Sequence, residues 1–287
     1  MRVLITGAGG RLGRALMQAA PAAADPVALS RADLDIADRA AIDAIVDRHR
    51  PDLVINAAAY TAVDAAEQAP DAACQANRDG PAQLADAVRR HGGRLVHIST
   101  DFVFDGHASR PYRPADPPAP LGVYGASKAA GEAAVRQRLP AALIVRTGWL
   151  YAGDDRDFVG RMLQLLAAQD AVGVVDDQIG TPTRAASLAR AIWRLVDARA
   201  SGIHHFTDAG VASRYDFAQA IREEALAVGR LARAATVHPI ATADFPTPAR
   251  RPAFGVLDKS ATWALLGGAA AHWREELTRA LRDGAGG

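Results

Sequence analysis

The chain has 287 residues, of which 49% are hydrophobic and 23% charged, and its formal net charge is +1 with a pI near 8.0. This length allows either one large α/β domain or one domain with a smaller companion, and the balanced charge gives no basic field for nucleic acid. A single cysteine, Cys74, excludes an internal disulfide, and we interpret it as a packing residue. No apolar run reaches the roughly 20 residues of a membrane span, and the first residues form a strand pattern instead of a signal peptide. We therefore expect a cytoplasmic protein that binds neither membrane nor nucleic acid.

The first elements are typical of a dinucleotide-binding unit. Residues 2–6 form a short apolar run that predicts a buried strand, and an Ala-rich amphipathic helix pattern follows a loop with glycines at Gly7, Gly10 and Gly13. Glycines permit a tight turn and a close approach of the backbone to a pyrophosphate, which the N–H groups of the helix N-terminus can bind. A plain tight turn is the alternative. The position directly after the first strand favours a cofactor loop.

A second predicted strand, over residues 26–29, ends at Ser30 and Arg31. In a dinucleotide-binding sheet this end meets the adenosine ribose, where an acidic residue favours a free 2′-hydroxyl and a basic one accommodates a 2′-phosphate. We therefore expect NADPH as the cofactor, with NADH possible. The alternative is that Arg31 is only a solvated side chain.

The remaining pattern alternates between helices and strands. Up to residue 150 it predicts helices over 38–49 and 124–138, a helix ending near 91–93, and strands over 52–59, 94–98 and 141–147. This alternation indicates a Rossmann-type doubly wound parallel sheet. Beyond it we predict helices over 157–168, 186–199 and 215–228 and strands over 172–175 and 202–207, whereas 237–252 has no clear period. We assign residues 1–150 to an NADP(H)-binding domain. Residues 151–287 are mainly a smaller substrate-binding lobe, with some segments returning to the sheet.

Tyr124 and Lys128 are the strongest catalytic candidates. They are four residues apart in the predicted opening of a helix, so both side chains project from one face. The pair combines a proton donor with a neighbouring cation. Only two of the 33 lysines and arginines are lysines, Lys128 and Lys259, which favours a role for a compact ammonium with a tunable pKa. A half-packed tyrosine beside a solvated lysine is the alternative.

With these motifs in view, the chain resembles the extended short-chain dehydrogenase/reductases, and among them the dTDP-4-dehydrorhamnose reductase family. The resemblance covers nearly the whole length. Besides the glycine loop, it rests on DLDI at 33–36, NAAAYTAVD at 56–64, STDFVFDG at 99–106, YGASK at 124–128, RTGWLYA at 146–152 and DQIGTPT at 177–183. The glycine loop and YGASK belong to the whole superfamily, whereas the others are more specific.

The resemblance implies NADPH-dependent reduction of the 4-keto group of dTDP-4-dehydro-L-rhamnose to dTDP-L-rhamnose. It implies three kinds of cofactor contact: to the pyrophosphate, to the adenosine, and to the inner part of the cofactor. The pyrophosphate would be bound by Gly10, Arg11 and Leu12, beside Gly7 and Gly13. The adenosine would be bound by Ser30 or Arg31, with Asp35 and Ile36. The inner part of the cofactor would be bound by Ala59, Tyr60, Thr61 and Ile98, with Tyr124 and Lys128.

In the implied mechanism Tyr124 donates the proton to the developing alkoxide. Lys128 is expected to lower the pKa of Tyr124 and to bind the nicotinamide ribose, while the Thr100 hydroxyl holds the substrate oxygen. Thr100, Asp101 and Trp149 are the implied substrate contacts. Asp101 could instead be a turn-capping residue, and Trp149 could instead be core packing.

Some features depart from the family or leave alternatives open. Tyr60 stands where we expect a smaller or histidine side chain. Ala15 stands where some relatives carry a glutamate of a metal-linked dimer, so we expect no metal and either a monomer or a homodimer. Another 4-keto-sugar-nucleotide reductase, or an epimerase, is the alternative function. A non-catalytic NADP-binding regulatory subunit is disfavoured by the intact catalytic residues. The candidates for binding the substrate phosphates are unranked: Arg184, Arg250 and Arg251.

Overall fold

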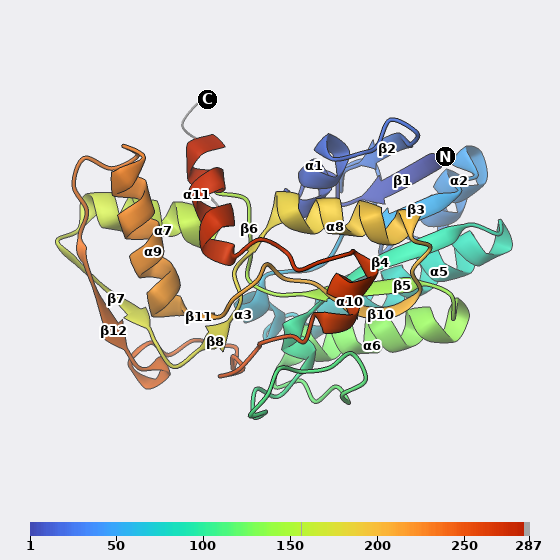
Figure 1. The fold of residues 1–287 in the computed structure, drawn as a ribbon. Coiled ribbons are helices and arrows are strands. Elements are labelled where there is room, and N and C mark those ends of the chain that lie inside the picture. Colours follow the sequence, from blue (N-terminus) through green and yellow to red (C-terminus); the bar gives the residue numbers. More distant parts are fainter. Residues whose placement is uncertain (156, 284–287) are drawn as a thin grey trace.

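The centre of the molecule is a six-stranded parallel sheet with the strand order β10-β5-β4-β3-β1-β2 (Figure 1). The computed structural model describes residues 1–155 and 157–283. The four inner strands β5, β4, β3 and β1 are mostly buried, as expected for a sheet covered on both faces, whereas the edge strands β2 and β10 are more exposed. The strand bounds are β1 Arg2–Thr6, β2 Asp25–Leu29, β3 Leu53–Asn56, β4 Arg94–Thr100, β5 Leu143–Thr147 and β10 Gly202–His205.

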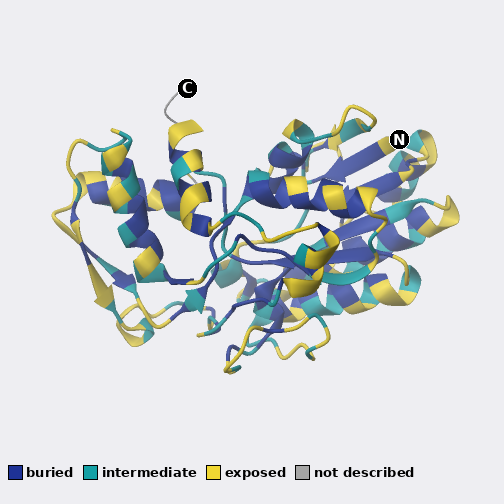
Figure 2. Ribbon diagram, in the orientation of Figure 1, coloured by how far each residue is buried: buried dark blue, intermediate teal, exposed yellow. Residues whose placement is uncertain are grey.

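Helices cover both faces of this sheet, and the dark-blue strands in Figure 2 lie between them. Alternate residues of a strand point to opposite faces. Val3 and Ile5 therefore pack under α1 (Arg11–Gln18) and α8 (Ala185–Asp197), whereas Leu4 lies in the core on the other face. The helices there are α2 Arg39–His49, α5 Gly80–Arg90 and α6 Val123–Arg138.

The chain reverses its direction of travel across the sheet at β1. From β1 it runs outward to β2, and then crosses back to β3, β4 and β5. A crevice forms beyond the carboxyl ends of the strands at such a switch point, and ligands bind there. Four short elements surround this edge: α3 Val63–Ala66, α4 Pro70–Cys74, the π-helical turn η1 Gln75–Asp79 and the 3₁₀ turn η2 Asp101–Val103.

A second, smaller body lies at one end of the sheet, on the left of Figure 1. Its core is built around Phe217, whose ring contacts those of Tyr151, Phe158 and Trp273. Three two-stranded sheets belong to this part: β6 with β9, β7 with β12, and β8 with β11. The strand bounds are β6 Leu150–Tyr151, β7 Ala171–Val175, β8 Ile179–Gly180, β9 Thr183–Arg184, β11 Ala212–Ser213 and β12 Thr236–Ile240. The helix bounds in this part are α7 Phe158–Ala168, α9 Arg214–Ala227, η3 Thr242–Asp244 and α11 Trp273–Asp283, whereas α10 Ser260–Leu265 lies beside β10 of the central sheet (Figure 1).

The Rossmann-type sheet with a smaller C-terminal lobe is confirmed as the fold class. Segments on both sides of residue 150 build the sheet, because β10 pairs with β5 and α8 packs on α1. Strand β12 lies inside the stretch 237–252, for which the sequence predicts no element. Pro239 interrupts the ordinary strand signal there, and β12 pairs only with β7. Helices α10 and α11 were also not predicted.

Candidate functional site

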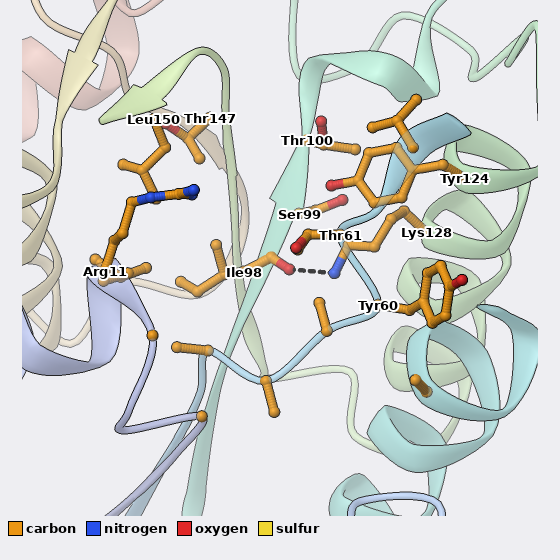
Figure 3. Close-up of a pocket in the computed structure, with 18 of the residues that line it drawn as sticks. Arg11, Tyr60, Thr61, Ile98, Ser99, Thr100, Tyr124, Lys128, Thr147 and Leu150 are labelled. Atoms are coloured by element: carbon orange, nitrogen blue, oxygen red, sulfur yellow. Dashed lines mark hydrogen bonds between the residues drawn. The ribbon is translucent and has the colours of Figure 1, made fainter. Parts of the chain in front are cut away.

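A cleft of about 760 Å³ opens at the carboxyl ends of β1, β3, β4 and β5, and reaches the lobe. Figure 3 shows part of its wall, with Tyr60, Thr61, Tyr124 and Lys128 on one side and Arg11 and Leu150 on the other. Residues far apart in the sequence meet here because the strands end at a common edge. The candidate residues that line the cleft are Gly7, Gly10, Arg11, Leu12, Gly13, Arg31, Asp35, Ile36, Ala59, Tyr60, Thr61, Ile98, Thr100, Asp101, Tyr124, Lys128 and Trp149.

Two glycines of this stretch, Gly7 and Gly13, have no room for a side chain. Gly7 has a φ of 67°, and a Cβ built there would lie 2.6 Å from the amide nitrogen of Ala58. A Cβ on Gly13 would lie 2.3 Å from the carbonyl oxygen of Gly7. Gly10 is the N-cap of α1 and supplies no side-chain cap, and the first turn of α1 contains no acidic residue. The backbone N–H groups at this helix N-terminus therefore suit an anion such as a pyrophosphate.

Ser30 is the candidate that does not line the cleft. Its hydroxyl donates to Oδ2 of Asp33 at 2.6 Å, and its backbone nitrogen donates to the same oxygen at 2.9 Å. These bonds engage the serine hydroxyl within its own turn. Arg31 does line the cleft, and its side chain is 90% exposed, with Nη2 3.7 Å from Oδ2 of Asp35. The guanidinium is therefore accessible to a phosphate at this edge.

Helix α6 carries Tyr124 and Lys128 one turn apart, both on the wall of the cleft. Lys128 is buried, and its Nζ donates to the carbonyl oxygen of Ile98 at 2.6 Å (Figure 3). Thr100 is the last residue of β4, and its hydroxyl donates to Oδ1 of Asp101 at 2.9 Å. The cleft thus brings a phenol, an ammonium and a hydroxyl together.

The pKa of Tyr124 is raised, whereas the sequence analysis expected it to be lowered. Burial raises the pKa of Tyr124 to about 12, an effect that a hydrogen bond with the Thr100 side chain partly offsets. We expected Lys128 to lower this pKa, but its ammonium is directed to the Ile98 carbonyl. Burial lowers the pKa of Lys128 itself to about 8, and the nearby Glu132 carboxylate partly opposes this shift.

The end of the cleft next to the lobe contains a pair of charged side chains, Asp101 and Arg214, of which the sequence analysis identified only Asp101. Asp101 is 2% exposed, and burial raises its pKa to about 6, with Arg214 acting in the opposite direction. Arg214, the first residue of α9, lies over the ring of Trp149 at 3.5 Å from the centroid. Burial lowers the pKa of Arg214 to about 10. Trp149 adopts a φ of 49°, a conformation that is strained for a bulky side chain.

Arg214 was missed in the sequence analysis, although a signal marks its helix. Ser213 and Asp216 form a capping box at the start of α9, and this pattern predicts a helix N-terminus at Arg214. Nothing local indicates that this N-terminus faces the cleft. Among the three phosphate candidates, Arg251 lines the cleft, whereas Arg184 is bound to Glu276 at 3.1 Å. The lining residues of the cleft do not include Arg250.

Among the residues that the structure describes, no helix is long and apolar enough to cross a membrane. No group of three or more His, Cys, Asp or Glu side chains within 1–155 and 157–283 could hold a metal ion.

Comparison with known proteins relates the chain to one family. The family model described as RmlD substrate binding domain matches residues 1–285. The dTDP-4-dehydrorhamnose reductase of Mycobacterium tuberculosis is 46% identical over 98% of this chain and 92% of the relative. A dTDP-4-keto-6-deoxy-D-glucose reductase of Streptomyces niveus is 41% identical over 98% of this chain and 96% of the relative. The crystal structure of dTDP-4-dehydrorhamnose reductase from Bacillus anthracis in complex with NADP has a TM-score of 0.92 and 34% identity, covering 98% of this chain and 99% of that one.

The sheet, the glycine loop and these matches define an oxidoreductase of the NAD(P)H-dependent, Rossmann-fold class. Within that class the chain belongs to the dTDP-4-dehydrorhamnose reductase family. The matches extend over both the sheet and the lobe, so they include every wall of the cleft.

Proposed function

We propose that the protein reduces the 4-keto group of dTDP-4-dehydro-L-rhamnose with NADPH, and that Tyr124 donates the proton. The observation that carries this proposal is the meeting of Thr100, Tyr124 and Lys128 in the cleft that the glycine loop lines. The 46% identity to a named dTDP-4-dehydrorhamnose reductase supports the substrate. We further propose a cytoplasmic enzyme, monomeric or homodimeric, that uses no metal ion.

The walls of the cleft fit a phosphorylated dinucleotide. The glycine-rich stretch from Gly7 to Gly13 would hold the pyrophosphate, and the exposed guanidinium of Arg31 would hold a 2′-phosphate. Lys128 would hold the nicotinamide ribose. When bound, NADPH supplies a hydride to the carbonyl carbon of the substrate. The NADP complex of the relative from Bacillus anthracis supports this choice of cofactor.

Tyr124 is suited to give a proton to the oxygen of the ketone. Its pKa of about 12 keeps the phenol in its acid form at neutral pH. The ammonium of Lys128 donates to the Ile98 carbonyl, so its proposed role is to hold the nicotinamide ribose and not to ionise Tyr124. The hydroxyl of Thr100 is a second donor for the same substrate oxygen. Asp101, Trp149 and Arg214 would contact the sugar nucleotide.

Another 4-keto-sugar-nucleotide reductase is the second candidate. The relative from Streptomyces niveus, at 41% identity, is named for a different 4-keto sugar and supports this alternative. An epimerase would return the hydride and consume no NADPH. A regulatory subunit would have no physical need for Thr100, Tyr124 and Lys128 in one cleft.

The test follows the absorbance of NADPH, and separately of NADH, after purified protein is added to enzymatically generated dTDP-4-dehydro-L-rhamnose. We expect stoichiometric loss of NADPH. Tyr124→Phe should lower kcat by about 10²–10⁴-fold, the usual contribution of a positioned proton donor, while NADPH still binds. No loss of either cofactor, despite cofactor binding, would exclude this substrate and lead to the other 4-keto sugars.

A further inference from the structure

One short stretch of chain, residues 60–67, contacts three separate parts of the site. It begins at Tyr60 and Thr61 on the cofactor side of the cleft and continues into α3. Figure 3 shows Tyr60 and Thr61 on the side of the cleft that carries Tyr124 and Lys128. We call it the 60–67 segment. Its polar contacts explain how distant walls of the cleft are held together.

Asn77 fixes the beginning of the 60–67 segment. Its Oδ1 accepts from the backbone nitrogen of Tyr60 at 2.8 Å, and its Nδ2 donates to the Tyr60 carbonyl at 3.0 Å. Nδ2 also donates to Oγ of Ser127 at 3.0 Å, one residue before Lys128 on α6. Asn77 is fully buried in the π-helical turn η1, a kind of turn that is frequent at functional sites. The cofactor side of the cleft is thus tied to the catalytic helix.

Glu67, at the end of the segment, caps α6. The N-cap residue of this helix is Gly122, which has no side chain to offer, and Oε1 of Glu67 accepts from the backbone nitrogen of Val123 at 2.8 Å. A Cβ on Gly122 would lie 2.5 Å from that oxygen, so the glycine permits the approach. A carboxylate is favourable at a helix N-terminus. The capped residue directly precedes Tyr124.

Asp64, in the middle of the segment, holds the lobe. Its Oδ1 accepts from the backbone nitrogen of Ala249 at 3.1 Å and from Nη1 of Arg251 at 3.1 Å, and its Oδ2 accepts from Nη2 of Arg251 at 2.7 Å. The hydrogen bond from Arg251 lowers the pKa of Asp64, so the carboxylate is charged at neutral pH. Arg251 lines the substrate end of the cleft and lies close enough to Arg214 to lower the pKa of that guanidinium.

We propose that the 60–67 segment couples the cofactor end of the cleft to the substrate end, with Glu67 and Asp64 as positioning residues for Tyr124 and Arg251. The inference rests on the proposed function, because it takes NADPH and a dTDP-sugar as the two ligands. The segment is hydrogen-bonded to both ends of the cleft, so a ligand that favours the observed position of the segment at one end also favours binding at the other. The coupling is reciprocal by thermodynamic necessity.

The first test measures binding and not turnover. We would determine the Kd of NADPH by calorimetry with and without saturating dTDP, which is unreactive. We expect dTDP to tighten NADPH binding at least about 5-fold, the lower end of ordinary coupling. Asp64→Asn should reduce this factor to below about 2-fold and leave the Kd of NADPH alone within about 2-fold, because Asp64 contacts the lobe and not the cofactor loop.

The outcomes separate the two proposals. Full coupling in Asp64→Asn, or two ligands that bind the unaltered protein without coupling, would overturn the inference and leave the reductase intact. Failure of the unaltered protein to bind NADPH or dTDP would overturn the proposed function and this inference with it.

A second test concerns Glu67. Glu67→Ala removes the cap, so we expect kcat to fall at least about 10-fold with the Kd of NADPH nearly unchanged, as a misplaced catalytic group does. Glu67→Gln keeps an oxygen that can accept from Val123 and should restore most of the loss. Asp86→Asn is the matched control, since Asp86 pairs with Arg138 at the other end of the same helix. Normal kcat in Glu67→Ala, or no rescue by glutamine, would contradict the role.

Discussion

Tyr124 and Lys128, which lie on one face of α6, have pKa values shifted in opposite directions. Burial raises the pKa of Tyr124 to about 12 and lowers that of Lys128 to about 8. Both shifts favour the neutral form, because the site provides little water to solvate a charge. At neutral pH the phenol keeps its proton and the amine is still charged. The same residue types on an open helix surface would titrate near their ordinary values.

This pair of shifts predicts the alkaline limb of the pH profile. The charged form of Lys128 is populated below its pKa of about 8 and is lost as the pH rises through that value. Tyr124, with a pKa near 12, cannot titrate in this range. We expect kcat/KM for NADPH-dependent reduction to fall above about pH 8, measured from pH 6 to 10.

Lys259 provides the control for that profile. Burial also lowers its pKa to about 8, but it lies over the ring of Trp263 and does not line the cleft. Lys259→Met should therefore keep the alkaline limb where it is. A limb that moves in Lys259→Met, or activity that is flat up to pH 10, would show that Lys128 does not control the profile.

At the scale of elements, the loop between β1 and α1 depends on its close contacts. A Cβ on Gly13 would lie 2.3 Å from the Gly7 carbonyl oxygen, a distance that real side chains do not adopt. Gly9, in the loop itself, has nothing within 4 Å of a Cβ built in the same way, whereas Gly13 lies in the first turn of α1 and packs against the loop. The two glycines are four residues apart and differ in packing, which makes them a matched pair.

We predict that Gly13→Ala lowers the free energy of unfolding by about 1–3 kcal/mol, because the methyl group forces backbone to move. Gly9→Ala should change it by less than about 0.5 kcal/mol, as surface substitutions usually do. Urea unfolding of the cofactor-free protein measures both values. Equal effects of the two substitutions would mean that the close contact between α1 and the loop is not a determinant of stability.

At the scale of the whole molecule, the sheet and the lobe have separate cores. The sheet core has one layer under α1 and α8 and another under α2, α5 and α6, whereas the lobe core is centred on Phe217. The cleft lies between them, so each core supplies one end of the site. Polar contacts across the cleft, such as Asp64 with Arg251, join two bodies that are each packed independently.

This division predicts a local effect of a core substitution in the lobe. Phe217→Ala removes a fully buried ring and should cost about 3–5 kcal/mol in the stability of the lobe. Hydrogen exchange should become faster in α7, α9 and α11, while the amides of β1 to β4 keep their protection and NADPH still binds. A uniform loss of protection across β1 to β4 as well would show that the two cores unfold as one unit.

The sequence by itself determined the parts that local physics encodes. Apolar runs and helical periods predicted the strands and helices of the sheet, and the spacing of Gly7, Gly10 and Gly13 predicted the tight turn between β1 and α1. The spacing of Tyr124 and Lys128 predicted one face of one helix. These signals are local, because each depends on residues that are neighbours along a single element.

Only the tertiary structure decided which side chains line the cleft and how burial shifts their pKa values. Arg214 lies over the ring of Trp149, 65 positions away in the chain. The raised pKa of Tyr124 depends on burial by several elements, and no spacing reports burial. Asp64 and Arg251, or Glu67 and Val123, meet only after the chain has folded. Such contacts have no local period, so the sequence could name candidates but could not pair them.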